Sequence, residues 1–586
     1  MPNRISLLRN SSVSMVIVGW STLLLCFGCG QKLDEEPRPQ PVSSQSPQPS
    51  RAGTSAVQFR DITEESGVSF VQTNGAEAGH FAILESLGSG VGISDFDCDG
   101  RMDCLLAGGG TFSPKPVPIS QKMGLYRNLG AWSFSRVDQS CALQHPEFYN
   151  HGVSTADFNN DGFEDFLVTG FGAIALYANN GDGTFENVTA EAMPFPVKWT
   201  TGAAWGDINS DGCLDVYVAN YVNWSFAHNP RCIRNGRQDV CAPAEFAALD
   251  DQLFVSNQDG TFIEGTQSAK LVEGGKGLGV LAADFNVDGH IDFYVANDTT
   301  SNFLYLGDGT GRLEERGFAC GVAVDDKATP NGSMGLDTAD TNNDGRPDIW
   351  VANFEDENFA LYENLGDGLF QHRSRRRGVS ATRNTYVGFG TSFLDFELDG
   401  DQDIVVTNGH VMVHRVNSPI RQRPILFENQ NGRFENVAAS IGGYFAQDHL
   451  GRGLAVGDLD NDGAPDLTIT HINEPVALLK NDSSTHNWLA VTLVGVKSNR
   501  SAIGTRITVD TSSSERHLQV TSGASYLSSN SRRQHIGLGN VSVVTRLEIR
   551  WPDGQQSILK SIPSKQHIMV LQSQEGYRRI PEKSER

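Results

Sequence analysis

The sequence is short of basic residues: 46 Lys and Arg stand against 70 Asp and Glu, which gives a formal net charge of −24. A nucleic-acid partner would require a basic surface, so we expect none. Beyond residue 29 the sequence also lacks a C-x-x-C pair, which leaves zinc or redox chemistry with little support. No long amphipathic helical pattern runs through the 586 residues, whereas 62 of them are Gly. This composition is typical of a turn-rich β protein that is too long for one ordinary domain.

The local patterns of common enzyme classes are missing as well. The sequence contains no G-x-S-x-G nucleophile elbow, no H-E-x-x-H zinc motif, no G-x-x-x-x-G-K-[ST] phosphate loop and no dinucleotide glycine fingerprint. We therefore assign no catalytic residue from the sequence.

The sequence does contain one nine-residue pattern, D-x-[DNE]-x-D-G-x-x-D, in seven copies. Side-chain oxygens stand at positions one, three, five and nine, and Gly at position six takes a backbone angle that other residues rarely tolerate. Such hard oxygens suit Ca²⁺ better than Mg²⁺, which keeps more of its waters. We therefore predict Ca²⁺ as the cofactor. The predicted ligands are Asp95, Asp97, Asp99 and Asp103; Asp157, Asn159, Asp161 and Asp165; Asp207, Asn209, Asp211 and Asp215; Asp284, Asn286, Asp288 and Asp292; Asp340, Asn342, Asp344 and Asp348; Asp395, Glu397, Asp399 and Asp403; and Asp458, Asp460, Asp462 and Asp466.

An EF-hand does not explain these loops. It requires a bidentate Glu at position twelve between two helices, whereas position twelve here is apolar, as at Leu106 and Val168. The loops also run into β-branched and aromatic stretches that predict strands. Four strands recur with each loop, every 50 to 77 residues, which indicates an all-β fold with a seven-bladed β-propeller over residues 57–482. The seventh repeat lacks its fourth strand, and we expect residues 57–63 to supply it and close the ring.

The N-terminus is typical of an export signal, with Arg4 and Arg9 ahead of an apolar run that is short for a membrane span. A small residue before Cys29 is similar to a bacterial lipobox, so residues 1–29 form a predicted signal peptide with Cys29 as the lipidated residue; Cys26 or ordinary cleavage are the alternatives. Residues 30–56, rich in Pro, Gln and Ser, are a predicted linker. We expect a cell-envelope lipoprotein, or a secreted protein without the lipid, that meets the membrane only through this anchor.

Export permits disulfides. Cys232 and Cys241 lie within a long insertion and predict a local disulfide, and Cys98 and Cys104 flank the first loop and could also pair. Cys141, Cys213 and Cys320 have no partner visible in the sequence.

Residues 487–572 alternate apolar and polar positions between Gly turns, which predicts a small β-sandwich, and residues 573–586 are a predicted tail. The seven repeats resemble the FG-GAP or VCBS repeats of integrin-type propellers. The stretches Asn487-Trp-Leu-Ala-Val, Ser522-Gly-Ala-Ser-Tyr526, His535-Ile-Gly-Leu-Gly539 and Trp551-Pro-Asp-Gly554 are similar to the ASPIC and UnbV domain of the cartilage acidic protein family. The resemblance implies extracellular calcium binding and adhesion-like roles.

We therefore expect a calcium-stabilised binding or adhesion scaffold for an extracellular glycan or protein. In an up-and-down blade the calcium loops share one face, and the long connections 107–123, 221–250, 372–384 and 409–424 share the other, which is the predicted ligand face. The alternative is an enzyme that acts on a polysaccharide or in a tailoring reaction, with its active site at the axial face. Its candidate acids or bases are His80, His410, His414 and His471.

The predicted ligand face carries many arginines for so acidic a chain. They represent either solvated loops that balance the acidic face or a basic patch for an anionic polymer or a carboxylate-bearing partner. The candidate ligand residues are Arg375, Arg376, Arg377, His410 and Arg415, with Arg231, Arg234, Arg237, Arg373, Arg383, Arg421 and Arg423 on the same loops.

Overall fold

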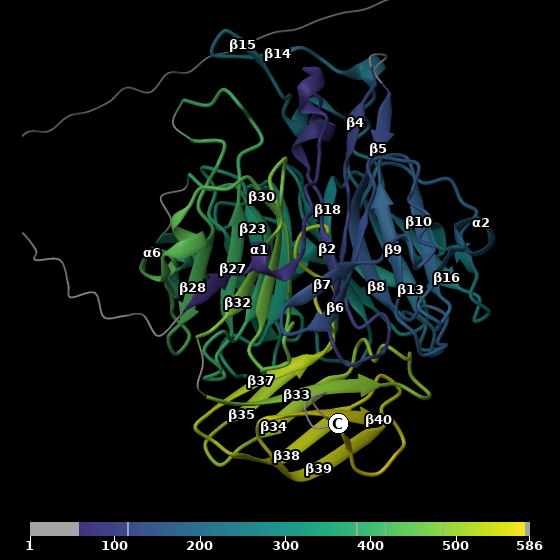
Figure 1. Cartoon of the computed structure of the whole chain (residues 1–586), viewed down its shortest axis with the longest axis vertical. Helices are drawn as coiled ribbons and strands as arrows, with labels where there is room; N and C mark the ends of the chain where they lie inside the picture. The colour runs from purple at the N-terminus through teal and green to yellow at the C-terminus, as the bar shows by residue number, and fades with distance from the viewer. Residues whose placement is uncertain (1–57, 114–116, 382–384, 417, 484–485, 581–586) are drawn as a thin grey trace, which may run out of the picture. The chain divides into compact units, whose positions relative to one another are not determined.

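The structure is a computed structural model that describes residues 58–580 apart from 114–116, 382–384, 417 and 484–485. Most of the described strands belong to seven antiparallel sheets that each contain four blade strands (Figure 1). From the inner to the outer strand, the first four sheets are β2 (Val91–Ser94), β3 (Asp103–Leu106), β6 (Gly124–Gly130) and β7 (Ser133–Arg136); β8 (Asn150–Ala156), β9 (Asp165–Gly170), β10 (Ile174–Asn179) and β11 (Phe185–Asn187); β12 (Thr200–Gly206), β13 (Asp215–Asn220), β16 (Gln252–Ser256) and β17 (Phe262–Glu264); and β18 (Gly277–Ala283), β19 (Asp292–Asn297), β20 (Phe303–Gly307) and β21 (Leu313–Glu315).

The remaining three sheets follow the same order. They are β22 (Ser333–Ala339), β23 (Asp348–Asn353), β24 (Ala360–Gly366) and β25 (Leu369–His372); β26 (Gly388–Leu394), β27 (Asp403–Asn408), β28 (Ile425–Asn429) and β29 (Phe434–Asn436); and β30 (Gly451–Gly457), β31 (Asp466–His471), β32 (Ala477–Asn481) and β1 (Phe59–Asp61). We refer to these sheets as blades one to seven. The outer strand of blade seven comes from the start of the described chain, because Phe59 pairs with Asn481 and Asp61 with Leu479.

The inner strands close into a ring. Each contacts the inner strand of both neighbouring blades, and β30 of blade seven contacts β2 of blade one. Seven tightly packed inner strands leave little lateral room, so small residues occupy close approaches: a Cβ on Gly390 of β26 would lie 2.4 Å from the Arg452 carbonyl oxygen of β30. The predicted all-β propeller is confirmed.

Short helices follow six of the outer strands, and the sequence analysis did not anticipate them. They are α1 (Thr63–Ser66), α2 (Thr189–Ala192), α3 (Thr266–Ala269), α4 (Gly317–Cys320), α5 (Ser374–Arg377) and α6 (Ala438–Ile441), and the 3-10 turns are η1 (Ala76–Ala78), η2 (Ile83–Ser86), η3 (Phe226–His228), η4 (Pro243–Glu245), η5 (Val379–Ala381) and η6 (Gly443–Ala446). Asn187 explains the start of α2, since its Oδ1 accepts the amide of Thr189 at 3.1 Å. One turn is too short to leave a 3.6-residue periodicity.

The C-terminal strands form two further four-stranded sheets, which agrees with the expected sandwich. One has the order β37 (Gln534–Gly539), β33 (Asn487–Val494), β40 (Gln566–Leu571), β41 (Arg578–Ile580); the other has β35 (Glu515–Gln519), β34 (Arg506–Asp510), β38 (Val543–Arg550), β39 (Gln556–Pro563). We call residues 487–580 the C-terminal domain. Strand β41 lies in the predicted tail but pairs with β40, so this part of the tail belongs to the domain.

One loop of the C-terminal domain enters the axis of the propeller. Residues 521–531, here called the axial segment, include the short strand β36 (Ser522–Gly523), which pairs with β18 of blade four. The Trp205 amide of blade three donates to Ser522 Oγ at 3.0 Å, and the Val153 amide of blade two donates to the Leu527 carbonyl at 3.0 Å. Ser525 joins three blades: its amide donates to Leu336, its Oγ accepts the Thr391 amide and its Oγ donates to the Leu454 carbonyl.

Blade one completes the set, because the Ser529 amide donates to the Val91 carbonyl at 2.9 Å. The axial segment therefore bonds to all seven blades. Serines and glycines suit this position, since their small side chains allow the close approach and their hydroxyls satisfy inner-strand amides that face the axis.

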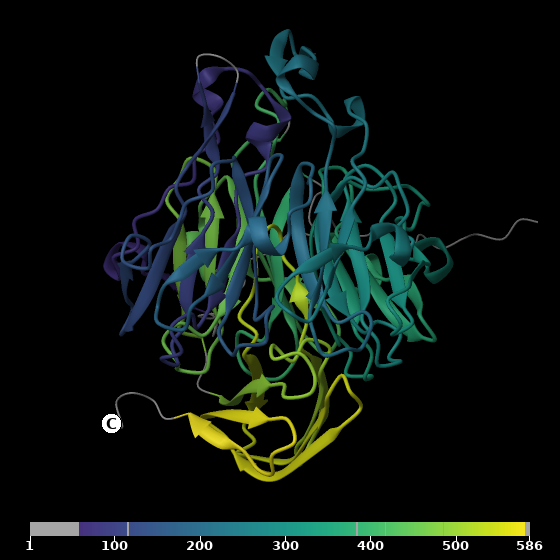
Figure 2. The same cartoon turned by 90° about the vertical axis from the view of Figure 1, so that its right-hand side faces the viewer.

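The insertions lie at the end of the propeller opposite the C-terminal domain in both views (Figures 1 and 2). They include the hairpins β4 (Gly110–Phe112) with β5 (Pro118–Ser120) and β14 (Cys232–Arg234) with β15 (Arg237–Asp239). We call this end the variable face. The long insertion of blade three packs on the rest of the protein: Tyr221, Trp224, Val240 and Phe246 join a hydrophobic cluster that also contains Tyr526 of the axial segment.

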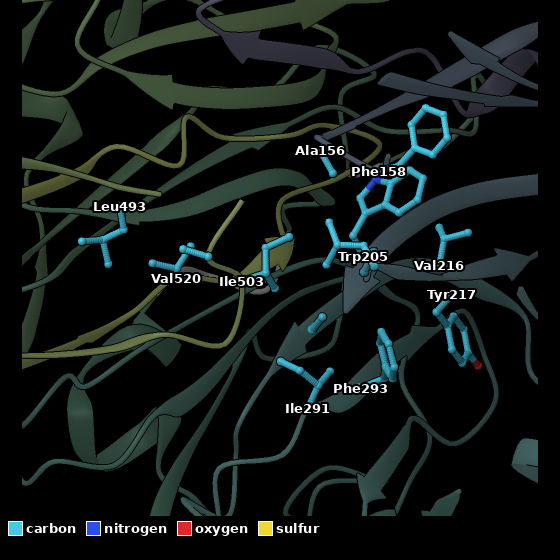
Figure 3. Packing of buried hydrophobic residues seen from close by; sticks show 14 of the residues in the cluster. Ala156, Phe158, Trp205, Val216, Tyr217, Ile291, Phe293, Leu493, Ile503 and Val520 are labelled. Atoms are coloured by element: carbon cyan, nitrogen blue, oxygen red, sulfur yellow. The ribbon is translucent and has the colours of Figure 1, made fainter. Parts of the chain in front are cut away.

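A second cluster joins propeller and C-terminal domain (Figure 3). Trp205 and Phe293 of blades three and four belong to the same buried cluster as Ile503 and Val520 of the C-terminal domain. Continuous apolar burial across the boundary stabilises the two parts as one packed body. No helix within the described residues is both long and apolar enough to cross a membrane.

Candidate metal loops and ligand face

The seven predicted calcium loops share one hydrogen-bond pattern. In every loop the carboxylate at position one accepts the backbone amides of positions five and six; Asp157, for example, accepts Asp161 at 3.0 Å and Gly162 at 2.7 Å. The same bonds recur at Asp95, Asp207, Asp284, Asp340, Asp395 and Asp458. These bonds wrap the chain around the carboxylate, and the remaining lone pairs of that carboxylate stay available to a cation.

Two positions in each loop, four and six, have a positive φ angle. Gly at position six takes this angle, with φ of 99° at Gly162, as the pattern predicts. Position four, which the sequence pattern does not mark, also has a positive φ: 59° at Asn160, 58° at Ser210 and 65° at Val287. Asn tolerates this region, but a β-branched residue such as Val287 is strained there.

The carboxylate at position nine connects the loop to its blade. Asp165 Oδ2 accepts the amide of Phe158 at 3.1 Å, and Asp165 Oδ1 accepts the amide of Asn179 in the third strand at 2.8 Å. The equivalent pairs occur in all seven loops. Position nine therefore has a structural role besides any role as a ligand.

An Asn on the third strand of five blades bonds to the neighbouring blade. Asn179 Nδ2 donates to the carbonyl of Phe96 in the preceding blade at 2.8 Å, and Asn364 Nδ2 donates likewise to Phe285 at 2.8 Å. This side chain joins two neighbouring predicted calcium loops in five of the seven blades. Blades three and four have Ser256 and Gly307 at the equivalent position.

Three loops bring acidic groups especially close together. Carboxylate oxygens lie within 4.8 Å of one another in three sets, which are Asp95, Asp97 and Asp99; Asp395, Glu397 and Asp403; and Asp458, Asp460 and Asp466. Burial raises the pKa of Asp157 and Asp207 to about 6 and that of Asp458 to about 7. A divalent cation beside such groups stabilises their ionised form. The donor set, hard oxygens on a loop with Gly at position six, fits Ca²⁺.

Side-chain cations also reach the acids of the first and seventh loops. Arg127 pairs with Asp97 and Asp99, and Lys480 pairs with Asp460 and with Asp462 at 2.7 Å. A bound cation would compete with these partners for the same oxygens.

The C-terminal domain covers the end of the propeller that carries the seven predicted calcium loops, which we call the loop face. The Arg500 amide donates to Asn160 Oδ1 at 2.8 Å, Arg516 Nη2 donates to the Asp399 carbonyl at 2.7 Å, and Arg533 Nη2 donates to the Gly100 carbonyl at 3.0 Å. Through the described residues, hydrogen bonds from this domain reach six of the seven loops. The third loop is also in close contact, because a Cβ on Gly212 would lie 2.6 Å from the Lys497 carbonyl oxygen.

A cavity of about 370 Å³ lies where this domain meets the loops of blades four to six. Asp284, Asp340 and Asp395 of the metal loops line it together with Arg506 and Arg533 of the C-terminal domain. Its charges of both signs belong to the contact between the domain and the loops.

The predicted ligand residues do not form one free basic patch. Arg377 bonds to Glu363 Oε2 at 3.0 Å and to the Gly432 carbonyl at 2.6 Å, and Arg415 pairs with Glu355. Among the other arginines, Arg234 pairs with Asp239, Arg421 with Glu474 and Arg423 with Asp448. Arg231, Arg237, Arg375 and Arg376 are exposed, and Arg383 lies outside the described residues. The sequence shows the arginines but not the acids that face them in the folded chain.

The candidate histidines are mostly committed to packing. His410 is buried, its Nδ1 accepts the Met412 amide at 2.9 Å and its Nε2 lies 3.2 Å from Glu355. His471 bonds to Tyr444 at 2.6 Å and to the Pro475 carbonyl at 2.6 Å, and burial lowers its pKa to about 4. His80 stacks edge-on against Phe112, and the carbonyl of His414 accepts Asn235 Nδ2 at 2.6 Å.

The cysteines follow the prediction only in part. Cys232 and Cys241 form a disulfide. Cys98 and Cys104 do not pair: Cys98 is exposed in the loop, whereas Cys104 is buried on strand β3. The predicted signal peptide, Cys29 and the linker lie outside the described residues.

Comparisons with known proteins agree with the repeat pattern. The FG-GAP-like repeat matches residues 95–168, 157–218, 284–351 and 340–406, and the ASPIC and UnbV domain matches residues 495–576. Cartilage acidic protein 1 of Mus musculus is 24% identical over 506 residues, covering 83% of this chain and 73% of that protein. The protein of the same name from Xenopus tropicalis is 26% identical, covering 70% of this chain and 71% of that protein.

Solved structures show only distant likeness. A lectin from Burkholderia pseudomallei is 10% identical, with a TM-score of 0.40 over 67% of this chain and 94% of that chain. An Agrocybe aegerita lectin that recognises terminal N-acetylglucosamine is 14% identical, with a TM-score of 0.36 over 65% of this chain and 85% of that chain. The chain thus consists of FG-GAP-like repeats followed by a C-terminal ASPIC and UnbV domain, and its homologues include proteins named cartilage acidic protein 1.

Proposed function

We propose that this protein is an exported, calcium-stabilised binding scaffold that recognises an extracellular glycan or protein through its variable face. The proposal rests on a structural difference between the two ends of the propeller. The C-terminal domain covers the loop face and the axial segment fills the axis, whereas the variable face carries insertions from several blades. Binding surfaces are commonly built from such loops on a rigid scaffold.

The insertions support one another. Asp239 of the disulfide-linked hairpin in blade three accepts the amides of Val413 at 2.9 Å and His414 at 3.0 Å in the blade six insertion. His80 and Phe226 stack edge-on at 5.2 Å, which connects the segment before blade one with the blade three insertion. A surface held in one arrangement loses less entropy on binding.

Apolar side chains are exposed on this surface. Val117 is 55% exposed, Ile233 56% and Val416 78%, and these residues come from the insertions of blades one, three and six. Exposed apolar groups above a rigid scaffold favour a recognition role over simple solvation.

Calcium enters the proposal through the seven loops. Six of the seven loops lie in segments that match the FG-GAP-like repeat, which often binds calcium, and three of the seven gather carboxylates within 4.8 Å. Calcium would hold the loops that join the first two strands of each blade, and the rigid ring would in turn hold the variable face.

Binding of the purified protein to an array of glycans and extracellular-matrix proteins tests the proposal, with calcium and with chelator. We expect calcium-dependent binding that the Ile233→Ser and Val416→Ser double variant loses. The matched control is Ile558→Ser, which removes an apolar side chain that is 48% exposed on the C-terminal domain. Binding that is lost in the control and kept in the double variant would contradict recognition through the variable face.

A further inference from the structure

A cavity of about 110 Å³ opens at the centre of the variable face, beside the residues that hold the tip of the axial segment. Its wall is mainly apolar and includes Leu87, Val240, Leu278, Met334, Phe389 and Met412. These residues come from several segments, and Cys241 of the disulfide stands beside Val240 in the wall. The volume is sufficient for a short aliphatic chain.

Two carboxylates interrupt this apolar wall. Asp298 is 9% exposed, and its Oδ2 accepts the hydroxyl of Tyr221 at 2.6 Å. Glu357 Oε2 accepts the amide of Gly332 at 2.9 Å. Within the described chain, no hydrogen bond reaches Asp298 Oδ1, and no basic side chain lies within 4.0 Å of either carboxylate. The backbone of Phe354 also stabilises the ionised form of Glu357.

The buried cations beside the cavity are already engaged elsewhere. Lys276 Nζ donates to the carbonyl of Pro243 at 2.8 Å, and its charge lowers the pKa of Asp298 without an ion pair between them. Burial is the larger effect and raises the pKa of Asp298 to about 6, and burial together with the charge of Asp298 raises that of Glu357 to about 7. Arg452, whose guanidinium lies 3.9 Å from the Phe389 ring of the wall, donates to the carbonyls of Ser86, Gly409 and Gly451 and forms no ion pair with either acid. Above the pKa of Glu357 both carboxylates are ionised and can pair with a cation that enters the cavity.

We propose that this cavity binds a primary ammonium group carried on a short aliphatic chain, either a free alkylamine or a lysine side chain. The ammonium has three donors and no acceptor, which matches two cavity-lining carboxylates that can each accept further hydrogen bonds. The aliphatic chain would fill the apolar part of the wall. A bare divalent cation fits less well, because Ca²⁺ takes six to eight oxygens and the apolar wall offers few.

The proposal gives a ligand class for the variable face and rests on the proposed function only for the location of binding. Calorimetric titration of the full chain with n-butylammonium tests it directly, with n-butanol as the neutral probe of the same length. We expect saturable binding of the ammonium and at least tenfold weaker binding of the alcohol. Equal affinities for the two probes would overturn the proposal.

Matched variants locate the site. Asp298→Asn and Glu357→Gln keep the shape and the acceptor oxygens while removing the charges, and we expect the double variant to bind n-butylammonium at least tenfold more weakly. Glu245→Gln removes an exposed charge from η4, next to the cavity wall, and should leave the affinity within twofold. Thermal unfolding of the same samples checks folding. A folded double variant with parental affinity would overturn the assignment.

Nα-acetyl-lysine N-methylamide, whose side-chain ammonium is free, tests whether the bound ammonium comes from a lysine side chain or from a free alkylamine. Binding as tight as that of n-butylammonium supports a lysine side chain, and binding confined to n-butylammonium supports a free amine. The array of the preceding section reports on the proposed function independently. Array binding without n-butylammonium binding would overturn the cavity proposal alone, and the reverse would leave the cavity proposal standing without the scaffold.

Discussion

The hydroxyl of Tyr526 donates a hydrogen bond to the carbonyl oxygen of Leu87 at 3.1 Å, although 439 residues separate them in the chain. Tyr526 belongs to the axial segment of the C-terminal domain, and Leu87 belongs to the hydrophobic cluster of the variable face. The C-terminal domain therefore reaches through the ring and contacts the opposite end. This contact makes the ring, the domain and the variable face one interdependent structure.

Truncation of Tyr526 tests this interdependence. Tyr526 is fully buried, so Tyr526→Ala should destabilise the protein by about 3 to 5 kcal/mol. Tyr526→Phe removes only the hydrogen bond and should cost about 1 kcal/mol. Urea unfolding should follow a single transition in all three proteins. Separate transitions of propeller and C-terminal domain in the parent would show that the axial contacts do not couple them.

Arg377 and Arg375 should differ, although both lie in α5. Arg377 bonds to Glu363 and to the Gly432 carbonyl, so Arg377→Ser should lower the free energy of unfolding by about 1 kcal/mol. Arg375 is exposed and is the matched control, with an expected effect below about 0.5 kcal/mol. Chemical denaturation compares the two, and equal effects would contradict the structural role of Arg377.

Asp298 should make stability depend on pH. Burial raises its pKa from 3.8 to about 6, while the Tyr221 hydroxyl and the charge of Lys276 act in the opposite direction. Its contribution to stability is therefore complete below pH 4 and is lost as the pH rises through 6. Asp298→Asn should be more stable than the parent at pH 8 and equal to it near pH 4, at a fixed calcium concentration. A stability difference between Asp298→Asn and the parent that does not change with pH would refute this account.

Loss of the Cys232–Cys241 disulfide should loosen the variable face. The bond spans nine residues, and its removal by Cys232→Ser with Cys241→Ser should cost about 2 to 3 kcal/mol by the loop-entropy estimate. Because Val240 lines the central cavity, n-butylammonium affinity should fall as well. Cys98→Ser, at an exposed unpaired cysteine, is the control and should change neither quantity. Thermal unfolding and calorimetric titration measure the two effects.

The repeats and their order could be predicted because each feature is local. The alternation of apolar and polar residues, the turn residues and the Asp95 to Asp103 spacing are each visible within a few residues of sequence. Because the seventh repeat lacks a fourth strand, residues 57–63 could be predicted to pair with its third strand. Periodic local patterns are the part of a fold that a sequence expresses most directly.

The contacts of the axial segment could not be predicted in the same way. Ser525 bonds to three inner strands, and nothing near residue 525 identifies its partners Leu336, Thr391 and Leu454. The basic patch was overestimated for a related reason: Glu355 and Glu363, which neutralise Arg415 and Arg377, meet them only in the folded chain. Charge balance on a surface depends on neighbours that sequence distance does not reveal.

Calcium should stabilise the protein loop by loop. With the dissociation constants of about 10⁻⁴ to 10⁻³ M typical of extracellular calcium modules, about 5 mM calcium contributes roughly 1 to 2 kcal/mol per occupied loop. Asp161→Ala, at position five of the second loop, should reduce the calcium-dependent gain by about one loop's share. Asp182→Ala, in an exposed turn of the same blade, is the matched control and should leave the gain unchanged.

The most direct test of the account is differential scanning calorimetry of the purified protein in about 5 mM calcium and in excess chelator. We predict a markedly lower Tm in chelator, restored by added calcium and not by the same concentration of magnesium. Superimposable unfolding curves in calcium and chelator would contradict the calcium-stabilised scaffold.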